Sequence, residues 1–191
     1  HVSQWTDYHA RLSTLFTRSA PVSEVAVLAP QADVWSDCGL ARQPFQVRPR
    51  YANKLWEPLQ QIGYNVEYIN QRVIRESQVV DGRLVFGEGA FSTVVLCDIR
   101  SMHTPVAARL REFVNAGGRL VVIGAAPVRT PSLRNAAEND HAMRRIASEL
   151  VEHERVLTLP APDDEESLFL WTLRHRDAFP EPRTVSIDSP V

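Results

Sequence analysis

Residues 93–124 read TVVLCDIRSMHTPVAARLREFVNAGGRLVVIG, and the class of fold can be predicted from them. It holds two apolar runs, Thr93 to Cys97 and Arg119 to Ile123, separated by a segment of helical spacing from about Pro105 to Ala116. Unbroken apolar runs are typical of strands that are covered on both faces, as in parallel sheets. Thr104 before Pro105 favours a helix start, and the two glycines at 117 and 118 favour its end. The stretch therefore predicts a strand–helix–strand unit with a right-handed crossover.

The same alternation extends along the chain on both sides of this unit. Further strands are predicted at Val25–Ala29, Asn65–Ile69 and Val156–Leu159, and further helices at Gln4–Arg18, Tyr51–Ile62, Asn139–His153 and Asp163–Arg174. Residues 31–49 are predicted to be a loop. Asp81-Gly82 between apolar pairs indicates a small two-stranded hairpin near 78–87, because a type I′ turn needs positive φ at both central residues. Together these elements predict an α/β fold with a doubly wound, mainly parallel sheet and the flavodoxin-like strand order 2-1-3-4-5.

The predicted elements fill one domain of ordinary size. We expect this domain to cover residues 1–178. Residues 179–191 show no helical period and are expected to form an extended tail that leads toward a further module. The chain begins with His1 rather than Met, which predicts a piece of a longer protein or a mature chain.

Composition argues against several classes of partner. The formal net charge is −2 and there is no basic stripe, so nucleic acid and anionic membranes are not expected to bind. No apolar run approaches the roughly 20 residues that cross a bilayer. Cys38 and Cys97 form no CxxC pattern and no zinc site with the histidines, and we expect two buried free thiols. The cellular compartment stays open.

Ligands of such sheets bind outside the carboxyl ends of the strands. Asp98 follows a strand and is expected to be exposed there as a ligand-binding carboxylate. The neighbouring loops add the other candidate ligand-binding residues, which are Trp35, Asp37, Arg100 and Arg129. Cys97 with His103 would suit a thiol nucleophile and its base, although Cys97 also fits a buried strand end. Neither a GxGxxG nor a P-loop motif is present, and neither a cofactor nor a metal is expected.

Several strings resemble one known family of domains. They are Trp5-x-x-Tyr8-x-x-Arg11-Leu12, Pro21-Val22-Ser23-Glu24-Val25-Ala26-Val27 with Trp35, Ile62-Gly63-Tyr64, and Phe113-Val114-x-x-Gly117-Gly118-Arg119. They resemble the glutamine-amidotransferase-like, flavodoxin-type domain of large bacterial glycoside hydrolases, of the α-L-rhamnosidase and β-galactosidase trimerisation-domain kind. The similarity covers roughly residues 1–130.

The resemblance implies a setting for the domain. In such proteins it follows a (β/α)₈ catalytic barrel that carries the catalytic carboxylates, and it precedes β-sandwich modules. True class I amidotransferases keep a nucleophilic Cys within Gly-x-Cys-x-Gly. Here the corresponding stretch is Gly124-Ala125-Ala126-Pro127-Val128, so Ala126 occupies the nucleophile position. Alanine has no nucleophilic group, and amidotransferase chemistry is therefore not supported.

Three hypotheses follow. The first is a non-catalytic accessory domain of a multidomain glycoside hydrolase, which supports the barrel, forms a subunit interface in a homo-oligomer, or lends the 31–49 loop to the rim of a carbohydrate site. The second is a stand-alone hydrolase or amidotransferase-like enzyme that uses the crevice around Cys97 and Asp98. The third is a small-ligand-binding regulatory domain of the flavodoxin type.

Overall fold

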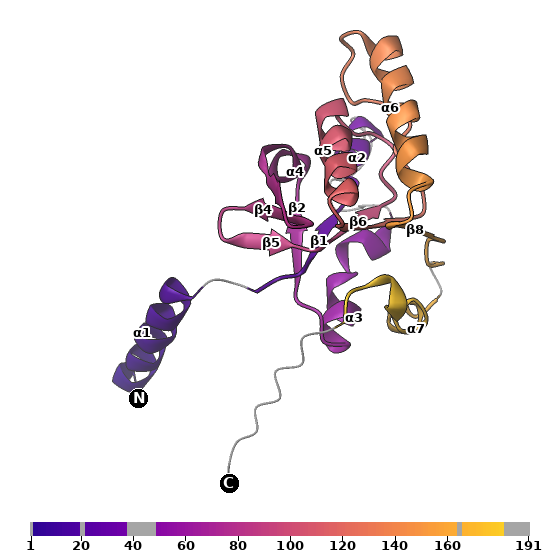
Figure 1. The fold of residues 1–191 in the computed structure, drawn as a ribbon. Coiled ribbons are helices and arrows are strands. Elements are labelled where there is room, and N and C mark those ends of the chain that lie inside the picture. Colours follow the sequence, from indigo (N-terminus) through magenta and orange to yellow (C-terminus); the bar gives the residue numbers. More distant parts are fainter. Residues whose placement is uncertain (1, 20–21, 38–48, 164–165, 182–191) are drawn as a thin grey trace.

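The computed structural model describes residues 2–19, 22–37, 49–163 and 166–181, and its centre is a five-stranded parallel sheet. The strand order is β2-β1-β6-β7-β8, which in terms of these five strands alone is the predicted 2-1-3-4-5. Figure 1 shows helices on both sides of this sheet. The strands are β1 (Val25–Leu28), β2 (Val66–Ile69), β6 (Thr93–Cys97), β7 (Arg119–Ile123) and β8 (Val156–Leu159). The predicted doubly wound α/β fold is confirmed.

The central strands are apolar because both of their faces are covered. All residues of β1 and β6 are buried, and Val25 pairs in parallel register with Val66 on one side and Thr93 on the other. Side chains alternate across a strand. Val94 and Leu96 therefore join one hydrophobic cluster and Val95 and Cys97 join the other.

The helices divide between the two clusters. The first cluster lies under α4 (Gln71–Glu76), α5 (Thr104–Asn115) and α6 (Ala136–Val151), with Phe113 of α5 and Met143 of α6 fully buried. The second lies under η1 (Arg50–Asn53), α3 (Trp56–Gln61) and α7 (Leu168–Arg174), where Trp171 is 1% exposed. Each apolar face of the sheet is thus closed by its own set of helices.

A second, antiparallel sheet has the order β3-β4-β5, with β3 (Gln78–Val80), β4 (Arg83–Phe86) and β5 (Gly89–Phe91). The predicted turn is present, since Asp81 and Gly82 have φ of 49° and 71°. The hairpin was predicted with two strands, and it has three. The added strand β5 is only three residues long, and a pattern of that length carries no period of its own.

Several helices differ from the sequence prediction. The segment predicted as one helix, Tyr51–Ile62, is split into η1 and α3 by a turn. The predicted loop 31–49 begins with a helix, α2 (Gln31–Asp37), and its residues 38–48, with Cys38, lie outside the described structure. The helix α4 was not predicted. It begins after Asn70, whose Oδ1 accepts a hydrogen bond from the backbone N–H of Val73 at 3.1 Å.

The first helix, α1 (Val2–Arg18), forms where a helix was predicted. Within the described ranges, no residue of α1 is buried, and Trp5 is 66% and Phe16 70% exposed. In Figure 1 α1 stands apart from both sheets. No helix in the described ranges is long and apolar enough to cross a membrane.

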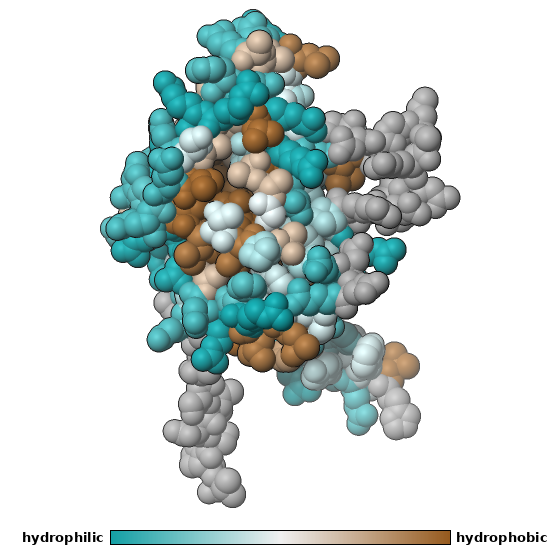
Figure 2. All heavy atoms as spheres, turned by 90° about the vertical axis from the view of Figure 1, so that its right-hand side faces the viewer, coloured by the Kyte–Doolittle hydropathy of each residue, from teal (hydrophilic) through white to brown (hydrophobic). Residues whose placement is uncertain are grey.

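An apolar patch also lies on the face that carries β8. Figure 2 shows hydrophobic side chains gathered there and bordered by hydrophilic ones. On this side of Figure 1 lie β8, the edge strand of the sheet, and α7. Leu157 of β8 and Leu170 of α7 are 39% and 56% exposed.

The segment after α7 is fastened to the amino end of β7. A short turn, η2 (Arg176–Ala178), follows α7. The Nη1 atom of Arg119, the first residue of β7, donates to the carbonyl oxygens of Ala178 at 3.4 Å and Phe179 at 2.9 Å. The Phe179 ring is buried, with its centroid 5.7 Å from that of Tyr64. The predicted tail beyond residue 181 lies outside the described residues.

Candidate functional site

The carboxyl ends of β6 and β7 meet at Asp98, which is held by three hydrogen bonds. Its backbone N–H donates to the carbonyl oxygen of Ile123 at 2.8 Å. Its carboxylate accepts from the Tyr51 hydroxyl at 2.8 Å and from the backbone N–H of Ala125 at 3.0 Å. Asp98 is half-buried rather than exposed as expected, because both of its carboxylate oxygens are taken up by the protein.

Gly124 is required by the closeness of this carboxylate. A Cβ atom at position 124 would lie 2.4 Å from Oδ1 of Asp98, and Gly124 has a φ of +73°. Asp98 has a left-handed backbone as well, with φ of 48°. Two adjacent strand ends therefore turn sharply against each other, with the carboxylate filling the space between them.

Cys97 points into the core below this carboxylate and not into a crevice. Its side chain is fully buried in the second cluster, and burial, with a smaller contribution from the negative charge of Asp98, raises the pKa of its thiol well above the usual range. Burial also raises the pKa of the Tyr51 hydroxyl, and the nearby Cys97 and Asp98 add to this effect. A nucleophilic cysteine needs a lowered pKa and access to substrate, and Cys97 has neither.

The structure does not bring Cys97 and His103 together. Cys97 packs in the cluster beneath α3 and α7. His103 precedes α5 and lines a cavity beside Val106, a member of the other cluster. The two side chains thus belong to opposite faces of the sheet, and no thiol–imidazole pair forms.

Arg129 and Arg100, both predicted as ligand-binding residues, meet at a buried carboxylate. Asp33 of α2 accepts hydrogen bonds at Oδ2 from the backbone N–H groups of Arg100 at 2.8 Å and Ser101 at 3.1 Å. The Arg129 guanidinium lies 3.6 Å from Oδ1 of Asp33, and its Nε donates to Ser101 Oγ at 2.9 Å. Arg129 and Asp33 therefore fix α2 to the strand ends. The side chain of Arg100 lies at the surface.

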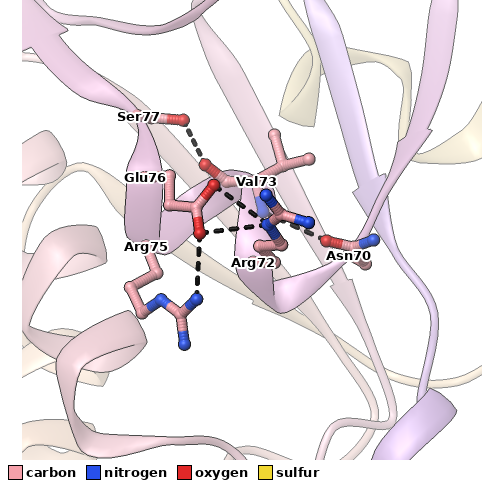
Figure 3. A network of polar contacts seen from close by, with 6 residues as sticks. All are labelled: Asn70, Arg72, Val73, Arg75, Glu76 and Ser77. Atoms are coloured by element: carbon pink, nitrogen blue, oxygen red, sulfur yellow. Dashed lines mark hydrogen bonds and ion pairs between the residues drawn. The ribbon is translucent and has the colours of Figure 1, made fainter.

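Trp35, 74% exposed, lines a cavity of about 270 Å³ near the carboxyl ends of β1 and β2. Further wall residues come from the end of β1, from α4 and from the start of α5, among them Leu28, Asn70, Gln71, Arg72, Arg75 and His103. Figure 3 shows the α4 wall, where the guanidinium groups of Arg72 and Arg75 converge on the Glu76 carboxylate. The side chain of Asp37, also predicted to bind ligands, lies outside the described structure.

Ala126 is partly buried and packs against the first cluster. In the described residues, no group of three His, Cys, Asp or Glu side chains lies together as a metal site would require. The predicted candidates thus fall into three groups, which are the Asp98 turn, the Asp33–Arg129 pair and the cavity beside Trp35.

Comparison with known families gives a match over most of the chain. The family model of glycoside hydrolase family 106, described as alpha-L-rhamnosidase, matches residues 2–159. The chain belongs to this family. The match begins at the first residue of α1 and ends at the last residue of β8, so it includes both the exposed helix and the whole parallel sheet.

A solved structure shows that this family 106 domain corresponds to a small part of a longer protein. The chain resembles the rhamnosidase from Novosphingobium sp. PP1Y with a TM-score of 0.55 and 25% identity. The similarity covers 92% of this chain and 16% of that one. No curated protein matches the chain significantly. The chain therefore corresponds to a domain of a larger glycoside hydrolase.

Sequence reasoning named Trp35 and His103 but missed the other residues that build the cavity. Arg72 and Arg75 lie on α4, a helix of six residues with Ile74 alone buried, which is too short to show an amphipathic period. Asp33, which holds α2 against the segment after β6, lies in the predicted loop 31–49. In this chain these residues lie close to the strand ends because α2 and α4 follow directly after β1 and β2.

Proposed function

We propose that this family 106 domain is a non-catalytic accessory domain of a larger α-L-rhamnosidase. It supports the adjacent (β/α)₈ catalytic barrel of the same polypeptide, with β-sandwich domains as further neighbours. Catalysis belongs to the barrel. The domain supplies a rigid α/β body and a surface on which other parts of the enzyme pack.

The observation that carries the proposal is the uncovered apolar face of α1. Trp5, Tyr8, Leu15 and Phe16 lie on one side of this helix, and each is more than half exposed. Contiguous exposed apolar surface of this kind marks an interaction site. Since the family match includes α1, we infer that the helix is part of the family's architecture and that another part of the larger enzyme covers its apolar face.

The strand ends support a structural role in place of a chemical one. Cys97 is buried, the Asp98 carboxylate is occupied by Tyr51 and Ala125, and Ala126 offers no nucleophile. We infer that the likeness to amidotransferases is one of fold, retained without its chemistry. The strand order and the Gly124 turn are compatible with such an origin.

The test removes the apolar face of α1. Trp5→Ser with Phe16→Ser is made in the 191-residue chain and in the longer polypeptide, and unfolding is followed by circular dichroism. The longer protein should lose stability, since truncating one buried aromatic side chain costs about 3–5 kcal/mol. The 191-residue chain should be unaffected, because these side chains are already exposed in it.

A matched control changes the opposite side of the same helix. Ser3→Ala with Thr14→Ala should leave both proteins unchanged. If the Trp5 and Phe16 replacements leave the longer protein as stable as the control replacements do, no other part of the enzyme covers α1. The proposal would then be wrong.

A second measurement addresses the rival enzyme. The 191-residue chain is assayed with an aryl α-L-rhamnoside and with a panel of amides and esters, beside Cys97→Ala and Asp98→Asn. Turnover that either variant abolishes would replace the accessory role with the rival.

A further inference from the structure

The cavity beside Trp35 has walls that are fixed by hydrogen bonds. The side chain of Gln71 donates from Nε2 to the carbonyl oxygen of Ser101 at 3.1 Å and accepts at Oε1 from the backbone N–H of His103 at 2.9 Å. Asn70 caps α4 through Oδ1, at 3.1 Å from the Val73 nitrogen. The start of α4 is therefore held against the segment that leads into α5, and the cavity between them is pre-formed.

The only charged residues among the described lining residues are the two arginines. Arg72 contacts both carboxylate oxygens of Glu76 through Nε at 3.0 Å, and Arg75 contacts one of them through Nη2 at 3.0 Å. The terminal nitrogens of Arg72, and Nε and Nη1 of Arg75, have no hydrogen-bond partner among the described residues. One carboxylate thus orients two guanidinium groups and neutralises one of them, which leaves a net positive charge and several donors directed to solvent.

Another wall of the cavity is aromatic. Trp35 of α2 lines the same cavity and presents its ring to solvent. A planar ring binds an apolar ring face of a ligand, while guanidinium groups bind carboxylates in bidentate fashion. A ligand that satisfies both walls therefore carries a ring with an apolar face and a carboxylate attached to it.

We propose that this cavity is a binding site for an acidic sugar residue, in which Arg72 and Arg75 bind the sugar carboxylate and Trp35 packs against the ring. The choice of a sugar among ring-bearing anions rests on the proposed function in a carbohydrate-active enzyme. The cavity of about 270 Å³ lies just below the usual 300–1,000 Å³ of sites for drug-sized ligands, and this size suits a single sugar unit.

The test titrates the 191-residue chain with D-glucuronic acid and with D-glucose. The two differ only at C6, which is a carboxylate in the acid and a hydroxymethyl group in glucose. Binding is followed by ¹H–¹⁵N NMR shifts of α2 and α4. D-glucuronic acid should bind at least 10-fold more tightly. Arg72→Gln with Arg75→Gln should abolish this preference, since hydrogen bonds to charged groups account for about a 10- to 100-fold change in affinity. Trp35→Ala should weaken the binding of both sugars.

A matched control and three further probes complete the test. Arg155→Gln removes an exposed arginine from another part of the surface and should leave binding unchanged. Spectra of each variant outside α2 and α4 report that the fold is intact. Equal affinity for both sugars, or a preference that survives the double replacement, would overturn the inference. Acetate or inorganic phosphate binding as tightly as D-glucuronic acid would reduce the site to an anion site, and tighter binding of AMP would make it a nucleotide site.

A simple anion site or a nucleotide site would equally overturn the inference of a sugar site. None of these readouts depends on α1 or on hydrolysis. The sugar site can therefore fail while the α1 test succeeds, and the α1 test can fail while the sugar binds.

Discussion

Replacing Asp98 by alanine tests whether the carboxylate at the strand ends stabilises the fold. The carboxylate accepts hydrogen bonds from the Tyr51 hydroxyl at 2.8 Å and the Ala125 N–H at 3.0 Å. A hydrogen bond to a charged group contributes about 1.5–3 kcal/mol, and a donor left without its acceptor costs about 1–3 kcal/mol. The left-handed backbone at this position costs a further 1–2 kcal/mol or so once alanine occupies it. We expect Asp98→Ala to lower the free energy of unfolding by about 3–5 kcal/mol, the contributions being less than additive.

The chain offers a control for the backbone part of this effect. Asp81, in the hairpin turn, has φ of 49° against 48° for Asp98, and it lies exposed at the surface. Asp81→Ala therefore reports the cost of alanine in the left-handed region without the network. Urea unfolding followed by circular dichroism should give a difference of about 2 kcal/mol or more between the two variants. A difference below about 1 kcal/mol would mean that the carboxylate contributes no more than its backbone does, and the reasoning would be refuted.

Three further results are expected. In a Cys38→Ser background, a thiol reagent should modify Cys97 only after unfolding. Modification of Cys97 in the folded protein as fast as that of an exposed thiol would contradict its burial. Burial raises the pKa of Tyr68 to about 12 and raises that of Tyr51 further, so both should remain protonated when model tyrosines ionise. A raised folded-state pKa contributes stability that is complete below the unfolded value near 10 and is lost as pH rises through the folded value, so absorbance at 295 nm and stability should change together above about pH 10. Trp171→Ala should lower the free energy of unfolding by about 3–5 kcal/mol. Trp171→Phe should lower it by less, because Nε1 of Trp171 has no hydrogen-bond partner among the described residues. An equal loss of stability in the two variants would contradict this.

The parallel sheet could be predicted from the sequence because unbroken apolar runs indicate strands that are buried on both faces. The runs at Val25, Thr93 and Arg119 are apolar at nearly every position, which happens when both faces are covered. The glycines that follow the helices separate the units clearly. The right-handed crossovers then reduce the possible strand orders to a few, one of which is the observed order.

Other features could not be predicted, each for a physical reason. The periodicity of α1 shows that one of its faces is apolar, but it does not show which surface covers that face. The rest of this domain does not cover it. The segment from Tyr51 to Ile62 keeps helical spacing across a turn, so its pattern does not reveal the break. Tyr51 and Asp98 meet across 47 positions, and no local pattern records such a contact. Short helices such as α2 and α4 have too few residues to show a period, and with them the cavity was missed.

The fastening of residues 177–179 by Arg119 bears on how the domain can be held on a surface. Arg119 opens β7, and Val25 opens β1, so the chain enters the sheet and is clamped at its amino edge, while Trp35 and the cavity lie at the carboxyl edge. A tag attached before Val25 or after Phe179 joins the chain at the edge of the sheet opposite the cavity. We therefore expect a chain immobilised through such a tag to keep its cavity accessible to ligands.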